Sequence, residues 1–91
     1  MAVTVKLPAQ LRDATGGEGA VEVDGTTVGE ALGALYERHG ELRSRMADDD
    51  GGLRRFVNVY LAGEDIRFLD GLDTPLPAGA EITVLPAVAG G

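Results

Sequence analysis

Residues 56–62 read Phe56-Val57-Asn58-Val59-Tyr60-Leu61-Ala62, and this stretch is the strongest strand signal in the chain. β-branched and aromatic residues dominate it, and both types favour extended backbone. Because side chains along a strand alternate between the two faces of a sheet, we predict a half-buried strand. The face toward a helix carries Val57, Val59 and Leu61, and the outward face carries Phe56, Asn58 and Tyr60.

Two shorter stretches with the same alternation come earlier in the chain. In residues 2–7, Val3, Val5 and Leu7 share one face, and Pro8 ends the pattern. Residues 20–23 repeat the alternation after a glycine-rich turn. Together they predict an amino-terminal hairpin, with residues 10–19 as a long, mobile loop.

Between these strands the apolar period changes to that of a helix. The apolar stripe consists of Val28, Ala31, Leu32, Leu35, Tyr36 and His39. Thr27 and Glu30 fit the capping box that begins a helix, and Gly40 is placed to end it. The sequence therefore predicts one main helix that lies across a sheet.

The rest of the chain predicts turns and two more strands. Residues 42–53 are polar and are interpreted as a loop with one short helical turn, and residues 63–65 as a tight turn into a short strand at 66–68. Residues 80–85 form the final strand. This order predicts an α+β fold, a mixed four- to five-stranded sheet packed on one main helix. A right-handed crossover is expected to set the strand after the helix parallel to the first.

Composition excludes several classes of function. The chain has 91 residues and a formal net charge of −7, which predicts a single domain and disfavours nucleic acid, whose binding needs Lys and Arg. It has no cysteine, so thiolate metal sites, disulfides and a cysteine nucleophile are absent. No signal peptide or membrane span is indicated, and we expect a cytoplasmic protein without a membrane partner.

No catalytic or metal-binding constellation is evident. His39 lies on the apolar stripe, and Ser44 lacks the context of a nucleophile. The aspartates at 48–50 lack the spacing of a calcium loop, and the glycines at 16–19 match no phosphate-binding motif. We therefore predict a protein that is not an enzyme and that holds no metal or cofactor of its own.

The chain ends in Pro86-Ala87-Val88-Ala89-Gly90-Gly91. Such a narrow segment can enter a channel and present a carboxylate without a β-carbon to a buried active site. The alternative is an ordinary frayed terminus. We predict a domain over residues 1–86 and a flexible tail over 87–91, because the small side chains of the tail offset little of the entropy lost on ordering.

The strand order and several segments resemble the ubiquitin-like sulfur carriers of bacteria, the MoaD/ThiS family, which includes the small subunit of molybdopterin synthase and the thiamine-biosynthesis carrier. The segments are residues 55–58, 65–68, 71–79 and above all 82–91. The resemblance implies a β-grasp fold and a cycle in which an E1-like enzyme adenylates Gly91 and a sulfur donor converts it to a thiocarboxylate. Val88, Ala89, Gly90 and Gly91 would enter the partners' active sites.

The tail favours the cysteine-biosynthesis branch of this family. There the resemblance implies that the sulfur attacks an intermediate on a PLP-dependent synthase and that a zinc metallopeptidase of the JAMM type releases cysteine. ATP, PLP and zinc would belong to the partners. Molybdopterin, thiamine and secondary metabolites remain alternative acceptors, and a ubiquitin-like protein modifier or interaction module is the alternative from another class.

The outward face of the sheet is the candidate contact site for partners. Phe56, Asn58, Tyr60 and Leu85 are expected to gather there, near the start of the tail. The acidic residues Glu22, Asp24 and Glu81 would surround them and favour a basic partner. The alternative is that residues 42–53 or 68–72 fold over this face.

Overall fold

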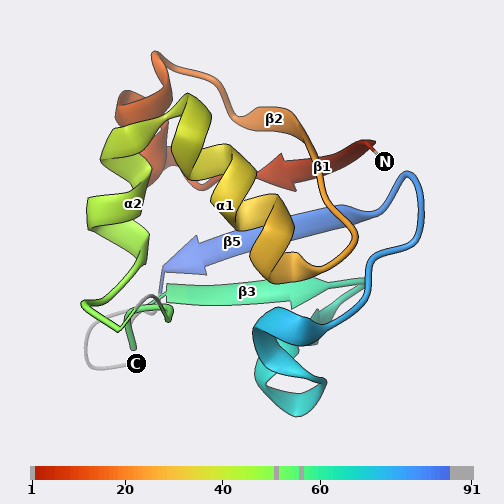
Figure 1. Cartoon of the computed structure of the whole chain (residues 1–91). Coiled ribbons are helices and arrows are strands. Elements are labelled where there is room, and N and C mark those ends of the chain that lie inside the picture. The colour runs from red at the N-terminus through yellow and green to blue at the C-terminus, as the bar shows by residue number, and fades with distance from the viewer. Residues whose placement is uncertain (1, 51, 56, 87–91) are drawn as a thin grey trace.

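The computed structural model describes residues 2–50, 52–55 and 57–86, which form one sheet with helices packed against it (Figure 1). The strands are β1 (Ala2–Lys6), β2 (Ala20–Asp24), β3 (Val57–Leu61), β4 (Glu64–Asp65) and β5 (Glu81–Pro86). The α-helices are α1 (Val28–Arg38) and α2 (Gly40–Met46), and the short 3₁₀ helices are η1 (Ala9–Thr15), η2 (Ile66–Phe68) and η3 (Gly71–Asp73). The expected α+β architecture is confirmed.

The last strand lies in the middle of the sheet. The strand order is β2-β1-β5-β3-β4, with β5 parallel to β1 and antiparallel to β3. The prediction that the strand after the helix runs parallel to the first strand is wrong, because β3 runs antiparallel to β1. The crossover rule relates the two strands that the helical segment joins, β2 and β3, and these do run in the same direction.

The core lies between the sheet and α1. Val3, Val5 and Leu7 are buried, as are Val57 and Val59, and Leu61 packs partly buried against them, as the alternation predicted. From α1 the buried side chains are Val28, Ala31, Leu32 and Leu35. The apolar faces of strand and helix therefore close on each other, while Tyr36 and His39 at the end of the stripe are half-buried.

The cap of α1 is confirmed with one difference in its partners. The Thr27 hydroxyl accepts from the Glu30 amide at 3.2 Å. The Glu30 carboxylate reaches back one residue further than a capping box, accepting from the amide of Thr26 at 2.8 Å and from its hydroxyl at 2.7 Å. These hydrogen bonds from Thr26 lower the pKa of Glu30.

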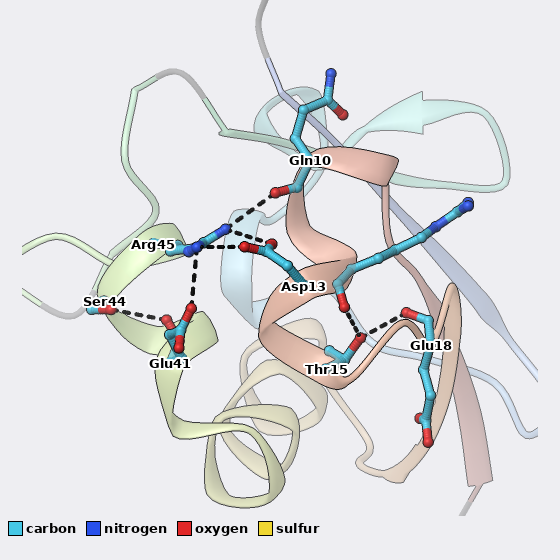
Figure 2. A network of polar contacts seen from close by, with 8 residues as sticks. Gln10, Asp13, Thr15, Glu18, Glu41, Ser44 and Arg45 are labelled. Atoms are coloured by element: carbon cyan, nitrogen blue, oxygen red, sulfur yellow. Dashed lines mark hydrogen bonds and ion pairs between the residues drawn. The ribbon is translucent and has the colours of Figure 1, made fainter.

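The prediction of a mobile loop over residues 10–19 is wrong for its first half, which forms η1. Leu11 and Ala14 pack partly buried against the core, which holds this segment in place. Thr15 is buried, and its hydroxyl bonds the carbonyls of Arg12 and Glu18 at 3.0 and 2.8 Å (Figure 2). The glycines that follow serve the turn, and Gly16 ends η1 in the left-handed conformation.

The loop predicted over residues 42–53 begins instead with helix α2. Its two apolar residues, Leu42 and Met46, stand four apart and are both fully buried in the core. Two buried side chains on one face are enough to hold a short helix whose other positions are polar. Gly40 therefore begins α2, and His39 is the residue that separates the two helices.

The strand predicted at residues 66–68 is also wrong. The strand lies earlier, as β4, and 66–68 form η2. Ala62 and Gly63 both have positive φ angles, of 53° and 84°, and so form a two-residue hairpin turn between β3 and β4. The Asp65 carboxylate then accepts from the Arg67 amide at 2.9 Å, which caps a helical turn and ends the strand.

Leu42→Ala tests the place of α2 in the core. We expect it to lower the free energy of unfolding by about 2–5 kcal/mol, because it leaves a cavity under a short helix. Ser44→Ala, at an exposed position of the same helix, should change it by less than about 0.5 kcal/mol. Urea denaturation of both variants measures the difference, and equal effects would contradict a packing role for α2.

Candidate functional site

The candidate site is the region where β5 ends, because the predicted tail follows β5 directly in the sequence. Val57 pairs with Pro86 and Asn58 with Leu85, so the start of β3 and the end of β5 lie side by side. We call this paired end the tail root. The predicted tail residues Val88, Ala89, Gly90 and Gly91 lie outside the described residues. Their expected role and flexibility remain predictions.

The outward face of the sheet beside the tail root carries the residues that alternation placed there. Asn58 lies opposite Leu85 and Tyr60 opposite Thr83 across the β3–β5 pair. Leu85 is 44% exposed, and Asn58 and Tyr60 are half-buried. Phe56, the fourth residue predicted for this face, lies outside the described residues. The structure therefore brings three of the four candidates together on one surface.

Neither of the two segments considered as a cover buries its apolar residues on this face. Leu42 and Met46 of α2 enter the core on the helix side of the sheet. Phe68 is 86% exposed and Leu69 is 38% exposed. Among residues 2–50, 52–55 and 57–86, neither segment therefore covers the outward face near Leu85.

The predicted acidic residues are exposed at the other end of this face. Glu22 and Glu81 both lie opposite Thr4, and Asp24 lies opposite Ala2. Glu81 is 3.5 Å from the Lys6 ammonium, and this exposed ion pair offsets part of its negative charge. Glu22 and Asp24 are exposed on the edge strand β2.

A mainly apolar groove of about 340 Å³ opens beside the tail root, on the helix side. Its lining residues come from η1, α2, β3, β5 and Arg54 just before β3, and they include Leu11, Val57 and Val84. Arg45 of α2 forms one wall. The groove therefore depends on the packing of η1 against α2.

Arg45 holds η1 and α2 together (Figure 2). Its guanidinium donates to both carboxylate oxygens of Asp13, at 2.8 and 2.9 Å, and to the Gln10 carbonyl at 3.1 Å. Glu41, one helical turn earlier, lies 3.1 Å from the same group. The sequence reasoning missed this clamp because it interpreted residues 42–53 as a loop. The four-residue spacing of Glu41 and Arg45 is typical of an ion pair on a helix, and it was the signal for α2.

The side chains weighed as catalytic candidates serve the fold. The Ser44 hydroxyl donates to the Glu41 carbonyl at 2.9 Å, and His39 joins the two helices. Asp48 accepts from the amides of Asp50 and Gly52 at 3.0 Å, which shapes its loop. Within residues 2–50, 52–55 and 57–86, no group of three or more metal-ligating side chains is arranged to hold an ion. In the same residues no helix has the length and apolar character to cross a membrane.

A five-stranded mixed sheet closed by α1, with the last strand at its centre and ending in the tail root, defines a ubiquitin-like β-grasp protein. The chain belongs to the ThiS family, whose model matches residues 5–91. The predicted MoaD/ThiS resemblance is thereby confirmed.

The relatives are carriers and modifiers. The sulfur carrier protein CysO of Mycobacterium tuberculosis is 43% identical over 93 residues, covering 100% of both chains. A chain in the crystal structure of the Amycolatopsis orientalis BexX/CysO complex is 45% identical with a TM-score of 0.89, covering 98% of this chain and 99% of that one. The Haloferax volcanii small archaeal modifier protein 1 is 37% identical with a TM-score of 0.83, covering 96% and 98%. These relatives support a sulfur carrier role and make the chain a carrier protein, not an enzyme.

Acid titration of the unfolding temperature tests the Arg45 clamp. The hydrogen bond from Arg45 lowers the pKa of Asp13 below its ordinary value of 3.8. A carboxyl group whose pKa is lower in the folded state than in the unfolded state stabilises the fold above about pH 4. That contribution is lost as the pH falls through the pKa of the folded state. We expect Asp13→Asn to melt at a lower temperature than the parent chain near neutral pH, with the gap narrowing on acidification.

The control for this titration is Asp49→Asn, which removes an exposed carboxylate and keeps the Asp13–Arg45 pair. A constant gap between Asp13→Asn and the parent chain across the acid range would contradict a stabilising ion pair.

Proposed function

We propose that this chain carries sulfur as a thiocarboxylate on Gly91 and donates it for cysteine biosynthesis. The observation that carries the proposal is the match to the ThiS family, which runs to Gly91, together with full-length similarity to a named CysO. The diglycine end and the apolar surface next to the tail root are consistent with it.

All of the bond changes on this chain take place at the carboxyl group of Gly91. A carboxylate is a poor electrophile because its charge is delocalised over two oxygens. Its attack on the α-phosphorus of ATP releases pyrophosphate and forms an acyl-adenylate. A sulfur donor then displaces AMP and leaves a thiocarboxylate, which is a nucleophile at neutral pH without a cysteine of lowered pKa.

The groups that perform these steps would belong to partner enzymes. An E1-like enzyme would bind ATP and adenylate the terminus. A PLP-dependent cysteine synthase would accept the sulfur, and a zinc metallopeptidase of the JAMM type would release the product. The thin tail, Val88 to Gly91, suits entry into each of these active sites in turn.

The second candidate function is protein modification. It is favoured by the similarity to the small archaeal modifier protein 1, which covers 96% of this chain. Both functions begin with adenylation of the same terminus. They differ in the nucleophile that then displaces AMP, which is a sulfur donor in one case and a protein amine in the other. Molybdopterin, thiamine or a secondary metabolite are further acceptors for the thiocarboxylate.

Incubation of the chain with its adenylating enzyme, ATP and a sulfur source tests the proposal. Intact-mass spectrometry should detect replacement of one oxygen by one sulfur. Addition of the cysteine synthase with its substrate should then join that sulfur to a cysteine skeleton still attached to the terminus, and the metallopeptidase should release cysteine and restore the original mass. An unchanged mass, or transfer of the whole chain to a protein amine, would contradict a carrier for cysteine formation.

Substitution of the penultimate glycine tests the narrow-tail argument. Gly90→Leu should reduce loading by about 100-fold or more, because a small misplacement of the reacting carbon costs that much. The melting temperature should not change, and Val88→Ala, which keeps the tail narrow, should load normally. Normal loading of Gly90→Leu would rule out a tight channel.

Leu85→Ala tests the outward sheet face as a partner surface. We expect the carrier concentration for half-maximal loading to rise about tenfold, as for a central interface residue. The free energy of unfolding should change by less than about 1 kcal/mol, because Leu85 is 44% exposed. Glu37→Ala, at an exposed position of α1, is the control. A large loss of stability would instead assign Leu85 to the core.

A further inference from the structure

Phe68 has the most exposed large apolar side chain in the described part of the chain. It is 86% exposed, and its neighbour Leu69 is 38% exposed. An aromatic ring in water forgoes the favourable free energy of burial, and contiguous exposed apolar side chains mark contact sites. The outward sheet face does not account for it, because Phe68 follows β4 at the edge of the sheet.

The turn that carries Phe68 is held at the residues around it. The Asp65 carboxylate accepts from the Arg67 amide at 2.9 Å, and Ile66 is only 2% exposed. The Leu69 amide donates to the Ile66 carbonyl at 3.0 Å. With Ile66 anchored in the core, η2 presents Phe68 to solvent. The ring is thus displayed by an ordered turn, so partner binding costs little backbone entropy.

Arg67 fixes this turn to the tail root. Its guanidinium donates to the Val57 carbonyl at 2.9 Å and approaches the Arg55 carbonyl at 3.4 Å. Val57 is the residue that pairs with Pro86, where the described chain ends. A protein that takes up the tail therefore meets Phe68 on a turn that Arg67 also ties to the tail root.

Two exposed arginines bring positive charge to this surface at the tail root, while the exposed carboxylates of Glu64 and Asp70 precede and follow Phe68 in the chain. The chain carries a net charge of −7, yet Arg55 and Arg67 are both exposed beside the tail root. The acidic edge formed by Glu22 and Asp24 lies on β2, at the opposite side of the sheet. Complementary charges set the orientation in which two proteins meet.

We propose that Phe68, with Arg55 and Arg67, is a docking surface for the enzyme that adenylates the chain. The partner surface it fits has an apolar pocket for one aromatic ring, flanked by carboxylates, at the mouth of the channel that takes the tail. The inference rests on the proposed function, because that enzyme has to hold the tail root while Gly91 reacts.

The test varies the concentration of the carrier in the loading reaction and follows thiocarboxylate by intact mass. For Phe68→Ala we expect the carrier concentration for half-maximal loading to rise about tenfold. The maximal rate of loading should stay the same. Phe68→Tyr, which keeps the ring, should recover most of the affinity. Arg55→Glu should also raise the half-maximal concentration, and Glu37→Ala is the control on α1. The melting temperature of Phe68→Ala should match that of the parent chain, because the ring lies outside the core.

The outcomes separate this inference from the proposed function. If the parent chain is not loaded, both are overturned. If the parent chain is loaded and Phe68→Ala has the same half-maximal concentration, only the docking surface is overturned. Sedimentation of the carrier alone gives the remaining outcome: a parent dimer that Phe68→Ala converts to a monomer would assign the ring to a second copy and overturn an enzyme pocket.

Discussion

The pairing of β5 between β1 and β3 is the constraint on which the rest of the structure depends. It places Ile82 and Val84, both almost fully buried, at the centre of the core. It also puts the end of the described chain at a fixed point, opposite Val57. A reactive terminus that leaves from a central strand has a rigid base, so a partner can locate it by binding the folded domain. The proposed function uses this pairing, because it needs a recognition surface at a fixed position next to the start of the tail.

In the function and the docking surface that we propose, the surfaces around the tail root differ in the chemistry that they offer to a partner. The outward sheet face offers Leu85 with half-buried Asn58 and Tyr60, the edge beyond β4 offers Phe68, and the exposed arginines carry charge opposite to that of the chain as a whole. None of these side chains needs to react. A carrier that visits several enzymes requires weak, separable contacts, and three small surfaces provide them more readily than one large apolar patch.

The elements that the sequence predicted well are those in which one periodicity extends over a whole element. Strict alternation located β1, β2 and β3, and the Thr27 cap located the start of α1. The misses were short elements held in place by packing and by side chains from distant segments. Helix α2 depends on Leu42 and Met46, too few for a clear period, and η1 depends on packing and on the Arg45 clamp between distant segments. For the candidate site, alternation predicted the outward face, whereas the exposure of Phe68 follows from the turn set by Asp65.

The most direct test of the account is to locate the sulfur within the loaded chain. Fragmentation of the intact loaded protein in a mass spectrometer reports the mass of each terminal segment. The account predicts that the oxygen-to-sulfur exchange appears only in fragments that contain Gly91 and disappears after exposure to the sulfur acceptor. Sulfur on any other residue, or a loaded species in which the Gly91 carboxylate is unchanged, would contradict it.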